Sequence, residues 1–120
     1  MEKKQRLETI ECARKAVDVA SEKQATDILL MDIRQVTTFA DFFVIMTAES
    51  RRQMEALSED MEEVLKVSGV ALHHREGTTD SGWLLLDFGD VIVHLFAPEE
   101  RGFYKLEDLW STGHQVLRIQ

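Results

Sequence analysis

The chain has 120 residues, of which 44% are hydrophobic, and a formal net charge of −8. This length fits one domain, and the apolar content is enough for a core, which excludes wholesale disorder. Because Lys and Arg bind phosphate backbones, an acidic chain without a basic run predicts little direct nucleic-acid binding and favours a protein partner. Acidity also improves solubility by itself, so charge alone does not define that partner.

The sequence also bears on the cellular compartment. No apolar run approaches 20 residues, so no transmembrane helix and no membrane partner are expected. The start, Met1–Glu8, is charged and lacks the apolar segment of a signal peptide. The single Cys12 cannot form an internal disulfide, and there is no Cys cluster for zinc, which favours a reducing cytoplasm.

The first half of the chain alternates helix and strand patterns. Residues 3–20 carry apolar side chains at steps of three and four, which predicts an amphipathic helix. Residues 27–33 and 42–47 are short apolar runs typical of buried strands. A second helix begins after Ser50, whose hydroxyl can accept from the third amide of the helix while Gln53 reaches back, as in a capping box.

The second half is less regular. Gly69 ends the second helix, and residues 70–76 form a third strand candidate. Near the end, Pro and acidic residues predict short helical turns at 98–101 and 105–112. The tail, 114–120, has no pattern that assigns it to a helix or a strand.

A β-hairpin is the clearest element of the sequence. Two apolar runs, 82–88 and 91–96, flank Gly89 and Asp90, which form a two-residue turn signal. Side chains alternate along a strand, so this loop length places one wholly apolar set on a single face, toward the core. The predicted cross-strand pairs on that face are Phe88 with Val91, Leu86 with Val93, and Leu84 with Leu95.

The opposite face of the hairpin is mixed. It carries Trp83, Leu85, Asp87, Ile92, His94 and Phe96. Large aromatics beside a few polar groups are typical of a surface that meets another macromolecule. The alternative is a strand buried on both sides, with Asp87 and His94 paired internally. A one-residue slip in register would exchange the two faces.

The order of elements predicts an α/β fold in a single domain over residues 1–120. It contains a five-stranded mixed sheet with two main helices plus short C-terminal helices. Two long helices cover one face of such a sheet and leave part of the other exposed. This arrangement favours the interpretation of the mixed hairpin face as a docking surface.

Several stretches resemble the ribosomal silencing factor family, also called the Iojap-related family. The resemblance covers roughly residues 5 to 112 and is most specific in the hairpin and the segment after it. The matching stretches are 41–45, 47–51, Glu76-Gly77, 83–96 and 101–110.

This resemblance implies a cytoplasmic bacterial protein that binds the large ribosomal subunit through ribosomal protein number fourteen. Bound there, it would block joining of the small subunit and damp translation when nutrients are scarce. The family's fold is similar to that of nucleotidyltransferases, without their known activity. Trp83 and Tyr104 are the expected anchors of the interface, while Asp87 and Glu107 are expected to meet Lys or Arg of the partner. The full set of expected partner-binding residues is Trp83, Leu85, Asp87, His94, Phe96, Tyr104, Leu106 and Glu107.

Two other classes of function are alternatives. A nucleotidyltransferase-like enzyme needs closely spaced carboxylates, usually Asp-x-Asp, and a Gly-Ser loop, and the sequence has neither. Asp87 and His94 are too few to hold a metal without a third ligand. We therefore expect no catalytic residue, no metal and no cofactor. A dimeric interaction module is the other alternative, because an exposed apolar face can form a homodimer when the protein is free of its partner.

Overall fold

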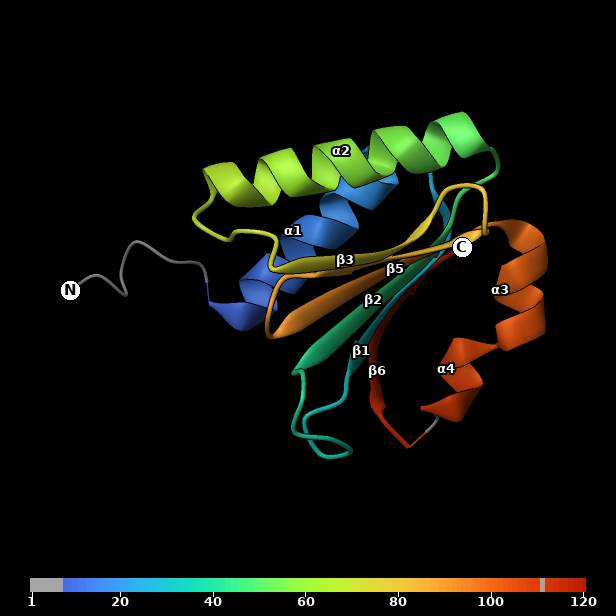
Figure 1. Ribbon diagram of the computed structural model, residues 1–120. Coiled ribbons are helices and arrows are strands. Elements are labelled where there is room, and N and C mark those ends of the chain that lie inside the picture. The colour runs from blue at the N-terminus through green and yellow to red at the C-terminus, as the bar shows by residue number, and fades with distance from the viewer. Residues whose placement is uncertain (1–7, 111) are drawn as a thin grey trace.

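The structure is a computed structural model that describes residues 8–110 and 112–120. Figure 1 shows helices α1 and α2 on one side of a twisted sheet and the short helices α3 and α4 on the other. In chain order the elements are α1 (Thr9–Glu22), β1 (Thr26–Asp32), β2 (Phe42–Thr47), α2 (Arg51–Val67), β3 (His74–Thr78), β4 (Trp83–Asp87), β5 (Val91–Phe96), α3 (Pro98–Tyr104), α4 (Leu106–Leu109) and β6 (His114–Ile119).

The sheet is mixed, as predicted, but it has six strands rather than five within the described residues, in the order β3-β4-β5-β2-β1-β6. β2 and β5 run parallel, and the other neighbouring strands are antiparallel. The additional strand, β6, comes from the tail that the sequence pattern left unassigned. It lies at the edge of the sheet beside β1, and only Val116 and Leu117 are half-buried, so its side chains show no clear alternation.

The predicted hairpin register is confirmed. Leu84 is paired with Leu95 and Leu86 with Val93, and the Phe88 amide donates to the Val91 carbonyl across the turn. Gly89 has a φ of +97°, a conformation that L side chains rarely adopt, which explains glycine at the first loop position. The apolar face of the hairpin packs with β1, β2, α1 and α2 in the larger hydrophobic core, as expected.

The cap of α2 holds the two long helices together. The Ser50 hydroxyl accepts from the Gln53 amide at 3.1 Å, as predicted. The Gln53 side chain accepts from the Glu49 amide at 2.6 Å, one residue earlier than in a standard capping box. Its NH₂ group also donates to the carbonyls of Lys23 and Gln24, so the start of α2 is tied to the end of α1.

Some predicted boundaries differ from the structure. The third strand begins at His74 rather than at residue 70, because Val70 and Leu72 pack against the core from an irregular segment. The first short helical segment, predicted for 98–101, extends to Tyr104, and the second is shorter than the predicted 105–112. The predicted start of the first helix, at residue 3, lies outside the described residues.

Candidate functional site

The face of the sheet opposite α1 and α2, here called the second face, is divided into a covered part and an open part. Leu106 of α4 packs over β5, β2 and β1 in a second, smaller core, joined by Ala40 from the loop before β2. Part of the second face is exposed, as expected, but three of the expected docking residues lie in the covered part and are buried. His94 is 3% exposed, Phe96 0% and Leu106 7%. The His94 ring packs against Phe43 and Trp83, while Phe96 packs against Tyr104 of α3 and belongs to the same core cluster as Leu106.

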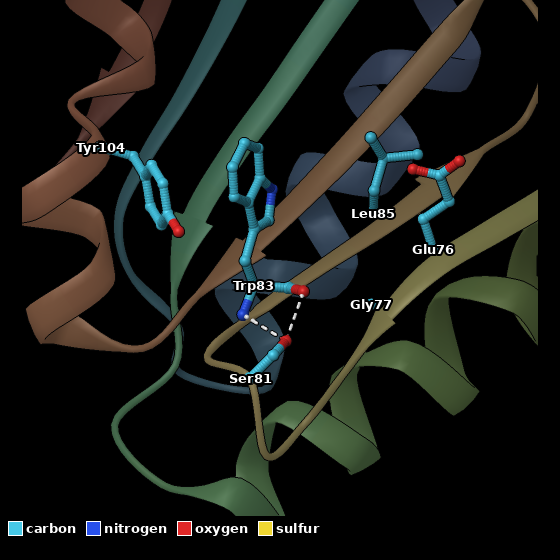
Figure 2. Close-up of a pocket in the computed structure, with 6 residues that line it drawn as sticks. All are labelled: Glu76, Gly77, Ser81, Trp83, Leu85 and Tyr104. Atoms are coloured by element: carbon cyan, nitrogen blue, oxygen red, sulfur yellow. Dashed lines mark hydrogen bonds between the residues drawn. The ribbon is translucent and has the colours of Figure 1, made fainter.

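The open part of the second face lies over β4. It is an open hollow of about 330 Å³, here called the aromatic hollow, lined by Glu76, Gly77, Ser81, Trp83, Leu85 and Tyr104. Figure 2 shows the indole of Trp83 standing between the Tyr104 ring and the Leu85 side chain. The Glu76 carboxylate lies at the rim of the aromatic hollow, beside Leu85, its cross-strand neighbour.

Aromatic side chains fix the walls of the aromatic hollow. The ring centroid of Trp83 lies 4.7 Å from that of Tyr104 and 4.8 Å from that of Phe96, which is the usual range for packed aromatic pairs. Trp83 is half-buried and Tyr104 is 43% exposed, so both present apolar surface to solvent. Phe103, next to Tyr104, is 78% exposed and extends this apolar surface along α3.

A buried imidazole lies beneath Trp83. The indole N–H of Trp83 donates to Nδ1 of His94 at 3.2 Å. Burial lowers the pKa of His94 to about 3, so the ring is neutral near pH 7. Because Nδ1 accepts, the proton of the neutral ring lies on Nε2, which has no hydrogen-bond partner among the described residues.

The two acids expected to meet a basic partner are engaged within the protein. Asp87 accepts from the Gly89 amide at 2.8 Å and so supports the hairpin turn. Glu107 lies 3.3 Å from the guanidinium of Arg101. Glu76 also has a partner within the protein, Nε2 of the exposed His74 at 2.9 Å, but unlike the other two acids it is exposed, at the rim of the aromatic hollow. Glu76 is therefore the acid of the aromatic hollow that is best placed to meet a partner.

A buried arginine anchors α3, and with it Tyr104, to the sheet. Arg101 is 6% exposed and donates to the Asp27 carbonyl at 2.9 Å and to the Thr47 hydroxyl at 2.8 Å. Asp27 also binds Arg118 of β6 at 2.8 Å, and the hydrogen bonds from Arg118 hold the pKa of the Asp27 carboxyl below its usual range. This network connects the edge of the sheet to the wall of the aromatic hollow.

The family model described as "Ribosomal silencing factor during starvation" matches residues 6–120. The chain belongs to this family. Membership in the ribosomal silencing factor family gives the protein a translation-regulating, ribosome-associated role, which is regulatory rather than catalytic.

Individual relatives agree with this family assignment. The ribosomal silencing factor of Bacillus subtilis is 35% identical over 98 residues, covering 82% of this chain and 83% of that protein. The mouse protein named mitochondrial assembly of ribosomal large subunit protein 1 is 32% identical over 98 residues, covering 79% of this chain and 43% of that protein. A crystal structure of a Chromobacterium violaceum protein has a TM-score of 0.84 at 31% identity and covers 88% of each chain.

Several residues that line the aromatic hollow are not among those predicted from the sequence. Glu76 and Gly77 belong to the stretches that resemble the family, but no role was assigned to them. Ser81 is not among the expected partner-binding residues, yet its hydroxyl donates to the Trp83 carbonyl and accepts from the Trp83 amide (Figure 2). The pairing register of β3 with β4 would have revealed Glu76, since it places that residue opposite Leu85.

The described residues contain neither a metal-binding cluster nor a membrane-spanning helix. In residues 8–110 and 112–120 no group of three His, Cys, Asp or Glu side chains could hold a metal ion. No helix in that part of the chain is both long and apolar enough to cross a bilayer. Burial raises the pKa of the Cys12 thiol to about 11, as expected for a packed side chain rather than a reactive one.

Proposed function

We propose that this protein represses translation by binding the large ribosomal subunit through ribosomal protein number fourteen. Bound there, it excludes the small subunit sterically and so prevents the two from joining. The repression acts in the cytoplasm when nutrients are scarce. It requires no chemical step, because two macromolecules cannot occupy the same surface.

The observation that carries this proposal is the open aromatic hollow on a member of the ribosomal silencing factor family. Half-exposed aromatic side chains beside a short list of polar groups are typical of the centre of a protein interface. The name of the mouse relative, which refers to the assembly of the mitochondrial large subunit, supports the choice of subunit.

Trp83 and Tyr104 are the proposed anchors. A fully buried aromatic side chain covers about 150–250 Å², which at about 25 cal/mol per Å² corresponds to several kcal/mol. Both rings are already partly covered within the protein, so each contributes only the part of this value that belongs to its exposed surface. Their mutual contact also reduces the side-chain entropy that would be lost on binding.

The electrostatics of the aromatic hollow favour a basic side chain from the partner. The lining residues include one carboxylate, Glu76, and no Lys or Arg among those described. The whole chain carries a formal net charge of −8. A Lys or Arg that enters the aromatic hollow would face the rings of Trp83 and Tyr104 and reach the Glu76 carboxylate. Such pairing contributes to orientation and to the association rate more than to affinity.

The proposal is tested by binding to purified components. Trp83→Ala and a control, Val67→Ala, are compared with the wild type for co-sedimentation with large subunits and for direct binding to purified ribosomal protein number fourteen. Val67 is a suitable control because it is 77% exposed on α2, on the opposite side of the sheet.

Wild type and Val67→Ala should bind in both assays. Trp83→Ala should lose binding in both assays while it keeps a cooperative unfolding transition. If folded Trp83→Ala binds with full affinity, Trp83 is only structural. If the wild type binds the large subunit but not the isolated ribosomal protein, the proposed partner is wrong.

A further inference from the structure

His94 is a buried polar side chain that the docking proposal does not use directly. It is 3% exposed, and its ring packs against Phe43 at 4.7 Å and lies parallel to Phe96 at 6.3 Å. One ring nitrogen accepts from Trp83, and the other has no hydrogen-bond partner among the described residues. The side chain therefore lies in an aromatic environment with half of its hydrogen-bonding capacity unused.

This arrangement is unfavourable for a residue whose only role is packing. A buried N–H without a partner destabilises the folded state, because its desolvation is not offset by a hydrogen bond. A phenylalanine at this position would fill similar space and bury no polar atom. The hydrogen bond to Trp83 is the polar contact of the ring that the structure does show, so it is the feature that distinguishes His94 from an apolar side chain.

That hydrogen bond sets the orientation of the indole. The cross-strand register places Trp83 opposite Phe96 and Leu85 opposite His94, so Trp83 and His94 are diagonal neighbours on the second face. The second side-chain torsion of tryptophan is broad, so packing alone specifies the ring weakly where one side is open to solvent. The acceptor, Nδ1 of His94, directs the indole N–H toward the buried imidazole. The apolar surface of the indole ring is then left to form the wall of the aromatic hollow.

We propose that His94 is a positioning residue for partner docking: its Nδ1 holds the indole of Trp83 in the orientation that forms the wall of the aromatic hollow. The docking part of this inference rests on the proposed function. The orientation part concerns the free protein alone and can be measured without any partner.

The test compares three substitutions. His94→Phe keeps the ring shape and removes the acceptor. His94→Asn places a carbonyl oxygen near the position of Nδ1 and so can retain the acceptor. His114→Phe is the matched control, because it makes the same chemical change on β6, at the opposite edge of the sheet from β3 and β4.

The first measurement is the indole N–H signal of the free, full-length protein in a proton–nitrogen correlation spectrum. Trp83 and Trp110 are the two tryptophans of the sequence, and a Trp110→Phe variant assigns their signals. In His94→Phe the Trp83 signal should move upfield, and its exchange with solvent should accelerate about tenfold, as expected for the loss of one hydrogen bond. In His94→Asn and His114→Phe it should stay close to the wild-type position.

The second measurement is affinity for purified large subunits. His94→Phe should bind about tenfold more weakly than the wild type, and His94→Asn should recover most of that loss. In a Trp83→Phe background, which lacks the indole donor, His94→Phe should cause no further loss. A purely structural role would instead lower affinity equally in both backgrounds.

The outcomes separate this inference from the proposed function. An unchanged Trp83 signal in folded His94→Phe overturns the inference, as does a displaced signal with wild-type affinity. Failure of the wild type to bind large subunits overturns the proposed function and the docking role together, while the spectrum still decides the orientation. If His94→Phe does not fold, His94→Leu removes the acceptor with a smaller side chain and undergoes the same two measurements.

Discussion

The burial of His94 predicts a specific loss of stability in mild acid. Burial lowers the pKa of this imidazole from 6.5 to about 3 in the folded protein. In the unfolded chain it titrates near 6.5. Between these two values the unfolded state binds one more proton than the folded state, so lowering the pH favours unfolding. The stabilisation is therefore complete above about pH 6.5 and is lost progressively as the pH falls toward 3.

The size of the effect follows from the gap between the two pKa values. At pH 5, about 1.5 units below the unfolded pKa, protonation of the unfolded chain at this one site is worth about 2 kcal/mol. A loss of this size is a large fraction of the stability of a small domain, which is about 5–15 kcal/mol.

The assay is urea unfolding followed by circular dichroism at pH 8 and pH 5, for the wild type and for His94→Phe. The variant lacks the titrating imidazole but keeps all other titratable groups. Among them are Asp27 and Asp32, whose pKa values are lowered from 3.8 in the folded protein, so their protonation destabilises the protein only in stronger acid than pH 5. The free energy of unfolding of the wild type should fall by about 2 kcal/mol more than that of the variant. Equal losses in the two proteins would refute the assignment of His94 as a buried, neutral imidazole.

Substitutions at three further residues test the aromatic hollow and its support. Glu76→Lys should weaken binding to the large subunit about tenfold or more and lower the association rate, whereas Glu76→Gln should have a smaller effect; equal binding by both would contradict a basic ligand in the aromatic hollow. Gly77→Ala should destabilise the protein by about 1–3 kcal/mol in urea, because Gly77 has a φ of +87° and a Cβ there would clash with the Trp83 carbonyl oxygen; a wild-type midpoint would contradict this. Arg101→Met should lower the free energy of unfolding by about 2–3 kcal/mol and should weaken docking, because Tyr104 would be displaced. Unfolding and binding curves that coincide for the variant and the wild type would contradict this role of Arg101.

The local features of the fold could be predicted from the sequence because they depend on nearest neighbours. Gly89 and Asp90 between two apolar runs are enough to fix the hairpin and its register. Ser50 followed by Gln53 is enough to place the start of α2. Both signals lie within a few residues of the structure that they determine.

The covered part of the second face could not be predicted, because it depends on where the chain folds after β5. The short helix α4 places Leu106 in the same core cluster as Phe96, and no local pattern gives that direction. The edge strand β6 was missed for a related reason. Its pairing with β1 joins residues about 90 positions apart, such as Ile28 and Ile119, and its side chains are mostly exposed.

The candidate site was only partly visible in the sequence. Trp83, Leu85 and Tyr104 were expected on one surface, and they do line one hollow. His94 was expected at the surface or paired with Asp87, whereas it is buried and accepts from Trp83. The predicted register already made those two rings diagonal neighbours, so the hydrogen bond could have been inferred from the pairing alone.

The most direct test of the central claim is the joining of purified ribosomal subunits, followed by light scattering. The wild type, added to large subunits before small subunits, should suppress the formation of complete ribosomes in proportion to its concentration. Trp83→Ala at the same concentration should not suppress it, and the control Val67→Ala should act as the wild type does. Normal joining in the presence of large subunits that are saturated with bound wild-type protein would contradict steric exclusion.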